Sequence, residues 1–124
     1  MTPKVLVVDD QPYMHVLLKH HLARHGFEML NAGNGREAVE VAMRELPALI
    51  LMDVMMEEMD GLAALKQLKA QAATASIPVI MITANAHHVT RTEAEAAGAV
   101  LYFTKPFSPT QLLREIQRLV PTTG

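Results

Sequence analysis

The stretch Val-Leu-Val-Val-Asp-Asp at residues 5–10 decides the fold, together with Leu-Ile-Leu-Met-Asp at residues 49–53. In both, four consecutive apolar residues end in aspartate. Apolar runs this short, separated by stretches of helical periodicity, are typical of the buried strands of a parallel sheet. The carboxyl ends of such strands are where open α/β proteins bind ligands. Asp9, Asp10 and Asp53 are therefore predicted to lie together at one edge of a sheet.

Two later apolar runs end in residues that complement this acidic cluster. Residues 79–82 lead to Thr83, and residues 100–103 lead through Thr104 to Lys105. If all four runs are parallel strands of one sheet, a single edge carries three carboxylates, a hydroxyl and an ammonium.

Strands and helices are expected to alternate five times. A weaker strand is expected near residues 27–31, after a helix over Met14–Leu22 that is capped by a left-handed Gly26. The other helices are expected at residues 36–46, from Asp60-Gly61 through Leu68, at 87–97, and around the amphipathic repeat of residues 112–120. This alternation predicts a flavodoxin-like α/β protein: a doubly wound, five-stranded parallel sheet with five helices.

Composition limits the class of protein. The 124 residues suit one domain, expected over residues 1–120 with residues 121–124 as a tail or the start of a linker. Eleven basic and thirteen acidic side chains give a net charge of −2 with no basic block, which disfavours direct nucleic-acid binding. The absence of cysteine excludes disulfides and thiolate sites.

His20, His21 and His25 lack a zinc-binding pattern and are expected to be solvated. With no signal-like N-terminus and no apolar span near the roughly 20 residues that cross a bilayer, a cytoplasmic protein is expected.

The motifs resemble the receiver domain of two-component response regulators, chemotaxis regulators among them, over essentially the whole chain. The resemblance rests on Val7–Asp10, on Asp53–Met56 leading to Met59-Asp60-Gly61, on Thr83-Ala84 and on Lys105-Pro106-Phe107. It implies the strand order 2-1-3-4-5 and a domain that takes a phosphoryl group from a histidine kinase to switch a partner-binding face. Glu57 departs from the family pattern, which has proline there, and is expected to loosen or re-aim its loop.

A divalent cation is expected at the acidic cluster. Three carboxylates within a few ångströms repel one another, and each resists ionisation unless a cation offsets the charge. Mg²⁺ suits the cluster because it takes carboxylate, water and phosphate oxygens, and Mn²⁺ is a possible substitute. By the resemblance, Asp10, Asp53 and the backbone carbonyl of Met55 bind the metal directly, and Asp9 binds it through water. Taken alone, Asp9 and Asp10 could instead only cap the following helix.

The resemblance makes Asp53 the phosphoacceptor, since a carboxylate can form an aspartyl phosphate. Lys105, aimed by a cis bond to Pro106, and the metal would balance the charge of the phosphoryl transition state. The hydroxyl of Thr83 and the backbone N–H of Ala84 are expected to donate to phosphoryl oxygens. If the resemblance is set aside, the alternative is that Lys105 is a solvated surface lysine and Thr83 is an ordinary strand residue.

Tyr102 and two further positions are expected to control the signal. The family's switch aromatic stands at Tyr102 and turns inward when Thr83 moves toward the phosphoryl group. The alternative is a half-buried strand tyrosine with its hydroxyl at water. The resemblance also places Met55 and Asn85 over the approach of the hydrolytic water. Because neither side chain activates water, a long-lived phosphoryl group is expected.

Two other functions fit parts of the pattern. Small phosphatases of the haloacid-dehalogenase type also use aspartate, Mg²⁺, a hydroxyl and lysine, but carry an acid/base aspartate two residues after the nucleophile. Gln11, Pro12 and Met55 follow the three aspartates at that spacing, so no proton donor is placed there. The chain is thus expected not to be an enzyme beyond its own phosphotransfer and dephosphorylation. A pseudo-receiver that only binds a partner is disfavoured because no acceptor group is missing.

The expected partners are a sensor histidine kinase or phosphotransfer protein and an effector protein or domain. The helix at residues 87–97 has only Val89 as a large apolar anchor, so it is expected to move together with the strand at 100–103 as an effector-binding face. Val100-Leu101 replaces acids that many receivers carry before the strand tyrosine. This favours a monomer or weak dimer over a tight, salt-bridged homodimer.

Overall fold

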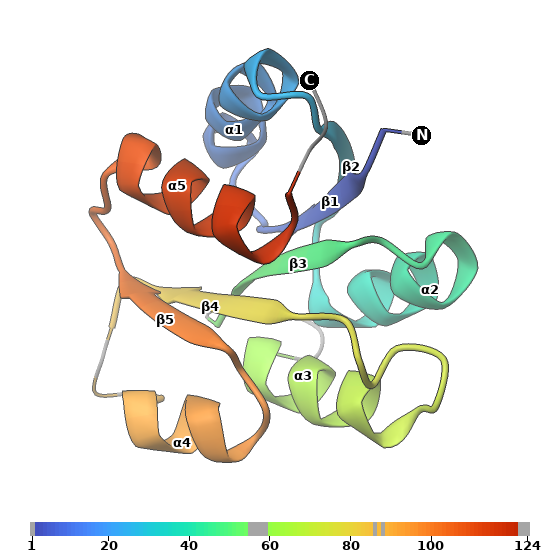
Figure 1. Cartoon of the computed structure of the whole chain (residues 1–124). Helices are drawn as coiled ribbons and strands as arrows, with labels where there is room; N and C mark the ends of the chain where they lie inside the picture. The colour runs from blue at the N-terminus through green and yellow to red at the C-terminus, as the bar shows by residue number, and fades with distance from the viewer. Residues whose placement is uncertain (1, 55–59, 86, 88, 122–124) are drawn as a thin grey trace.

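The computed structural model describes residues 2–54, 60–85, 87 and 89–121, which form a three-layer α/β sandwich (Figure 1). The strands are β1 (Lys4–Val8), β2 (Glu28–Ala32), β3 (Leu49–Asp53), β4 (Val79–Thr83) and β5 (Leu101–Thr104). The helices are α1 (Pro12–Arg24), α2 (Gly35–Glu45), α3 (Gly61–Ala70), α4 (Arg91–Ala96) and α5 (Pro109–Leu119).

The strands are parallel and lie in the order β2-β1-β3-β4-β5, so the predicted fold class and strand order are confirmed. The order reverses between β1 and β3, which are direct neighbours. Ligands of such sheets bind in the crevice at this switch point, beyond the carboxyl ends of the strands. Because Val8 lies opposite Met52 in the register, Asp9 and Asp53 come next to each other there.

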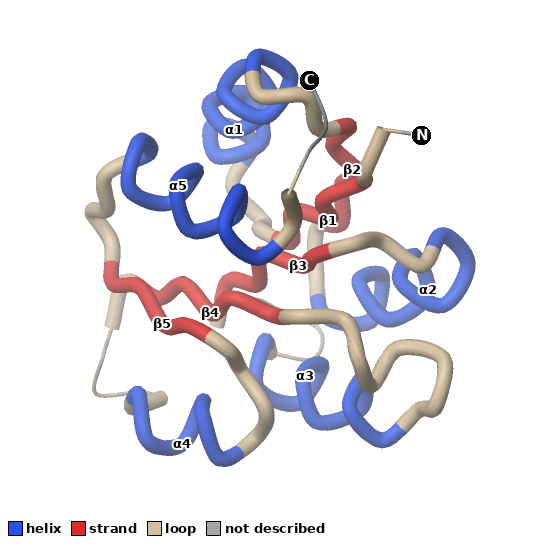
Figure 2. Tube along the Cα trace, viewed as in Figure 1, coloured by secondary structure: helices blue, strands red, loops and turns tan. Residues whose placement is uncertain are grey.

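Alternate strand residues face opposite sides of the sheet and build two cores. Figure 2 shows the strands as a central layer with helices on both sides. Helices α1 and α5 cover one side, over a core that includes Val5, Val7 and Leu51. Helices α2, α3 and α4 cover the other side, over a core that includes Leu6, Ile50 and Met52. Coverage on both sides explains why the residues of β3 and β4 are all buried and apolar up to the terminal Asp53 and Thr83.

Most predicted boundaries are within one residue of the structure. The strand expected at residues 27–31 is Glu28–Ala32, and the helix expected at 36–46 is Gly35–Glu45. Gly26 has the predicted left-handed conformation, with φ 85°. Leu46, which precedes Pro47, is also left-handed, with φ 47°, and forms the C-cap of α2.

The start of α4 differs from the prediction of a helix over residues 87–97. The helix begins at Arg91 because Thr90 and Glu93 form a capping box. The Thr90 hydroxyl oxygen accepts the Glu93 N–H at 3.1 Å, and the Glu93 carboxylate accepts the Thr90 N–H at 3.2 Å. Upstream, the Asn85 side-chain oxygen accepts the His87 N–H at 2.9 Å, so a side-chain turn stands where the first helical turn was expected.

Candidate functional site

Three aspartates meet at the carboxyl ends of β1 and β3. Asp9 and Asp53 are only 3% and 4% exposed, whereas Asp10 is exposed. One carboxylate oxygen from each residue lies within 4.8 Å of the other two. This donor set fits a hard divalent cation, because three like charges at this distance are costly to ionise without one and oxygen ligands suit Mg²⁺. The structure thus brings together the three acids that the sequence singled out.

Lys105 places its ammonium inside this cluster. Its Nζ atom lies 3.1 Å from Asp9 Oδ2 and 3.5 Å from Asp53 Oδ2, and its side chain is 15% exposed. Burial lowers the pKa of Lys105, but the Asp53 and Asp9 carboxylates more than offset this effect and hold the pKa above its ordinary value. The Lys105–Pro106 bond is cis, and the Lys105 N–H donates to the Thr83 carbonyl at 2.8 Å. A charged Lys105 is therefore fixed at the site and is not a solvated surface lysine.

Asp9 is held at each of its polar groups. Its N–H donates to the Ala32 carbonyl at 3.1 Å, and its Oδ1 accepts the N–H of Gln11 at 2.9 Å. Its backbone oxygen lies 2.7 Å from Nε2 of His15, and its Oδ2 faces Lys105. His15 is a neighbour of the site that the sequence analysis did not single out.

Asp53 is enclosed by the close approach of α3. The Val54 N–H donates to the Ile82 carbonyl at 2.9 Å, and the Gly61 N–H donates to the Val54 carbonyl at 3.0 Å. A Cβ atom at residue 61 would overlap the backbone oxygen of Asp53, so this contact requires glycine. The preceding Asp60 caps α3 through the N–H of Ala63 at 2.8 Å. Met55 and Glu57, for which a metal ligand and a loop change were predicted, lie outside the described residues.

Thr83 ends β4 and connects the site to the following loop. It is fully buried, and its hydroxyl oxygen accepts the Asn85 N–H at 3.0 Å and donates to the Asn85 carbonyl at 3.1 Å. Ala84 and Asn85 are exposed. The Thr83 hydroxyl can therefore donate to a ligand only by giving up its bond to the Asn85 carbonyl.

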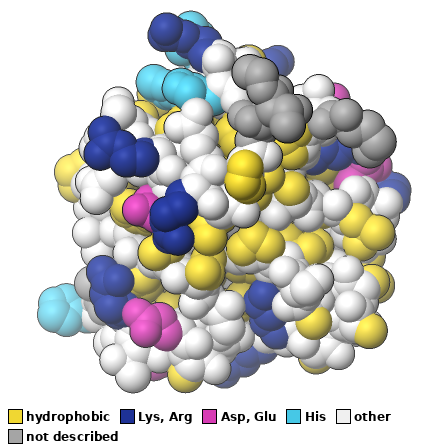
Figure 3. Space-filling view, in the orientation of Figure 1, with side chains coloured by type: hydrophobic (Ala, Val, Ile, Leu, Met, Phe, Trp, Pro, Cys, Tyr) yellow, Lys and Arg dark blue, Asp and Glu magenta, His cyan; other side chains and the backbone are white. Residues whose placement is uncertain are grey.

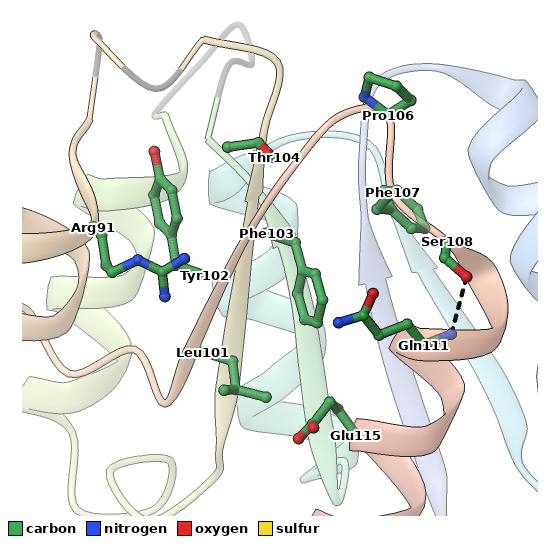
Figure 4. A pocket seen from close by; sticks show the side chains of 10 residues that line it. All are labelled: Arg91, Leu101, Tyr102, Phe103, Thr104, Pro106, Phe107, Ser108, Gln111 and Glu115. Carbon is green, nitrogen blue, oxygen red and sulfur yellow. Dashed lines mark hydrogen bonds between the residues drawn. The ribbon is translucent and has the colours of Figure 1, made fainter.

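Tyr102 points inward from β5. It is 6% exposed, and its hydroxyl donates to the Val89 carbonyl at 2.6 Å, in the segment between β4 and α4. The Arg91 guanidinium lies 5.3 Å from the ring centroid, and Figure 4 shows it beside the ring. Burial raises the pKa of Tyr102, and Arg91 partly counteracts this effect. The alternative of a hydroxyl at water is therefore wrong for this structure.

The fold and the site together define a flavodoxin-like α/β protein with an acidic, lysine-containing site at its switch point. Comparison with known proteins gives the family. The chain belongs to the response regulator receiver domain family, whose sequence model matches residues 5–117. The family predicted from the motifs is confirmed, and with it the general function of a receiver in two-component signal transduction.

Relatives and solved structures agree with this assignment. The transcriptional regulatory protein SrrA of Staphylococcus aureus is 39% identical over 123 residues, which cover 99% of this chain and 50% of that protein. The chain therefore spans about half the length of the curated relatives it matches. The chemotaxis response regulator CheY4 of Vibrio cholerae is 32% identical with a TM-score of 0.88, covering 97% of this chain and 100% of that one.

A second similar structure bears on the metal. The receiver domain of sensor histidine kinase PA1611 from Pseudomonas aeruginosa, with a magnesium ion coordinated in its active-site cleft, is 30% identical with a TM-score of 0.87. The match covers 98% of this chain and 100% of that chain.

In the described part of the present chain, no helix is long and apolar enough to cross a membrane.

Proposed function

We propose that Asp53 accepts a phosphoryl group from the phosphohistidine of a sensor kinase or phosphotransfer protein. The observation that carries this proposal is the ammonium of Lys105 between the buried carboxylates of Asp9 and Asp53, beside the exposed Asp10. A buried carboxylate next to a fixed cation can receive an anionic group that it would otherwise repel.

In the proposed reaction, an oxygen of Asp53 forms a bond to phosphorus while the phosphorus–nitrogen bond of the donor breaks. The departing imidazole takes the electron pair. Lys105 balances charge on the phosphoryl oxygens, to which the Thr83 hydroxyl and the Ala84 N–H donate. Mg²⁺, or Mn²⁺ in its place, supplies positive charge for the same oxygens when held by Asp10, Asp53 and the Met55 carbonyl, with Asp9 acting through water.

The test is labelling by acetyl phosphate with Mg²⁺, followed by intact-mass spectrometry. The parent is expected to gain one phosphoryl group and Asp53→Asn none. Asp60→Asn is the matched control, because Asp60 caps α3 outside the acidic cluster and asparagine also caps well. Equal labelling of Asp53→Asn and the parent would contradict the assignment. Sustained phosphate release from a generic phosphate ester would instead indicate a haloacid-dehalogenase-type phosphatase, and an unlabelled parent a pseudo-receiver.

The proposal includes a long phosphoryl lifetime. Asn85 is exposed next to the Thr83 end of β4, where it offers no base to an attacking water. Met55 is its proposed counterpart. Decay of the labelled parent is expected to be slower than decay of Met55→Asn/Asn85→Glu, and equal decay rates would contradict the role of both residues.

The proposed effector face is the groove along β5, between α4 and α5. The groove has a volume of about 410 Å³ and includes Arg91, Leu101, Phe103, Gln111 and Glu115 (Figure 4). In Figure 3 this region lies left of the centre and shows basic and acidic side chains with hydrophobic side chains between them. Apolar side chains such as Leu101 and Phe103 beside charges of both signs suit a partner protein. Neighbouring Val100 is 43% exposed and offers no acid for a salt-bridged dimer.

We further propose that residues 1–120 act as the receiver and residues 121–124 as a tail or linker, in the cytoplasm, as a monomer or weak dimer. The output is an effector protein or domain. Regulation of transcription, the function named for SrrA, is one such output.

A further inference from the structure

His15 links three parts of the molecule at the back of the acidic cluster. It lies in the first half of α1 and is partly buried. Its Nε2 atom is 2.7 Å from the backbone oxygen of Asp9, and its Nδ1 atom is 3.0 Å from Oδ1 of Asn31 in β2. One side chain thus joins α1, the residues after β1 and the neighbouring strand.

The chemistry of the two atoms fixes the direction of the key hydrogen bond. A carbonyl oxygen can only accept, so Nε2 of His15 carries a proton and donates to Asp9. The Asn31 amide can accept from a protonated Nδ1 through Oδ1 or, rotated by 180°, donate to an unprotonated Nδ1 through its NH₂ group. In either arrangement it restricts the rotation of the ring. The ring is therefore held at both nitrogens.

Asp10 depends on the peptide group that His15 holds. Its carboxylate is exposed and, within the part of the chain that the structure describes, makes no hydrogen bond or ion pair. The backbone oxygen of Asp9 belongs to the planar peptide unit that joins Asp9 to Asp10. A hydrogen bond to this oxygen therefore restricts the orientation of that unit and, through it, the direction in which the Asp10 side chain leaves the backbone.

We propose that His15 is a positioning residue for the metal site: by holding the Asp9–Asp10 peptide unit, it keeps the Asp10 carboxylate close to those of Asp9 and Asp53 before a cation arrives. This inference rests on the proposed function, in which Asp10 is a metal ligand. Residues that orient ligands without touching the metal commonly change its affinity by about 10- to 100-fold when replaced. Since Asp9 keeps its other contacts, the lower end is expected here, a loss of about tenfold.

The experiment compares Mg²⁺ affinity by isothermal titration calorimetry in the unphosphorylated parent, His15→Leu, His15→Gln and His20→Leu. His15→Leu should bind Mg²⁺ about tenfold more weakly. His15→Gln should recover most of the affinity, because its amide N–H can take the place of Nε2–H. His20→Leu is the matched control, since His20 is exposed on the same helix and its ring contacts that of His21. It should bind as the parent does.

Two further measurements separate positioning from general stability. Thermal unfolding in the presence of a chelator should show similar midpoints for His15→Leu and His15→Gln, although their Mg²⁺ affinities differ. Long-range ¹H–¹⁵N spectra of the metal-free parent should show His15 protonated at Nε2. Parent-like affinity in His15→Leu would overturn the inference and leave the proposed function intact, as would an affinity loss that Gln does not restore. A parent that binds no Mg²⁺ would overturn both.

Discussion

The two helices that flank β5 differ in how much they bury. Helix α5 has 11 residues and buries Leu112, Leu113 and Ile116, whereas α4 has six residues and buries only Ala94. Both pack on the strand that leads to Lys105. Large apolar side chains of α5 therefore anchor one side of β5. The other side is covered by α4, which buries little apolar area. This difference indicates that the α5 side holds Lys105 in place while the α4 side can rearrange at low cost.

Hydrogen bonds connect the α4 side to the candidate phosphoryl site. The Thr83 hydroxyl binds both backbone groups of Asn85, and the Asn85 side chain binds the N–H of His87. Further along the same segment, the carbonyl of Val89 accepts from Tyr102. A Thr83 hydroxyl that donates to a phosphoryl group must release the Asn85 carbonyl, because it has only one proton to donate. This release changes the start of the segment that receives Tyr102. Because Tyr102 is already buried in this structure, the proposed switch consists of retaining or releasing its inward position.

The largest expected effect is on stability, and it compares the two sides directly. Leu112→Ala removes a fully buried side chain of α5 and should lower the free energy of unfolding by about 2–5 kcal/mol. Val89→Ala, which removes the apolar anchor before α4, should cost only about 1–2 kcal/mol at ~0.8 kcal/mol per buried carbon. Urea unfolding measures both variants. Equal losses would contradict the difference between the two sides.

The second prediction concerns local opening. Backbone amides of α4 and the segment before it should exchange hydrogen faster than those of α5, because few buried contacts oppose their opening. A phosphoryl mimic such as beryllofluoride, with Mg²⁺, should change protection mainly between Thr83 and Lys105. Exchange by mass spectrometry with and without the mimic checks this. Uniform protection across that segment, or changes confined to α1, would place the output surface elsewhere.

The contrast between strongly buried elements and the weakly buried α4 also explains which features could be predicted from the sequence. The central strands were predictable because β1, β3 and β4 are buried on both sides and therefore nearly continuous in apolar residues. The site acids lie at or directly after the ends of β1 and β3, and Lys105 follows the shorter apolar run of β5. The predicted start of α4 at residue 87 is wrong, because an alanine-rich composition favours a helix without marking where it begins. The Thr90-Arg-Thr-Glu93 capping box was a signal that could have corrected it.

His15 could not be found by the same reasoning. Its two partners lie six and 16 residues away, on a strand end and on a neighbouring strand. The histidine contributes no apolar periodicity and belongs to no local motif. Only the packing of α1 against the sheet brings its ring to Asp9, so the contact depends on tertiary structure rather than on sequence spacing. The inward position of Tyr102 likewise depends on tertiary structure, because its hydroxyl donates to the carbonyl of Val89, 13 residues earlier in the chain.

A smaller effect is expected from removing the Tyr102 hydroxyl. Tyr102→Phe keeps the ring but removes the bond to Val89 and should lower the free energy of unfolding by about 1 kcal/mol. It should also speed exchange in the segment before α4, which this bond ties to β5. Tyr13→Phe is the control, since Tyr13 is 57% exposed. Unchanged exchange in Tyr102→Phe would show that the hydroxyl does not restrain the segment.

The smallest expected effect tests the α5 side through the charge of Lys105. The carboxylates of Asp53 and Asp9 outweigh burial and raise the folded-state pKa of Lys105 above its ordinary 10.5. A raised folded-state pKa means that folding favours the charged lysine, so its contribution to stability is fully present below the unfolded-state pKa. That contribution is lost as the pH rises through the folded-state value.

Urea unfolding in a chelator checks this sign. The difference in unfolding free energy between the parent and Lys105→Met should stay constant from about pH 7 to 9.5 and shrink only above about pH 10.5. Lys66→Met is the matched control because Lys66 is exposed on α3, and it should show no such dependence. A difference that already shrinks between pH 7 and 9 would mean that burial wins over the two carboxylates. In that case Lys105 would lose its charge too easily to balance a phosphoryl group. The two carboxylates beside it would then not be enough to keep it charged, although α5 holds it in place.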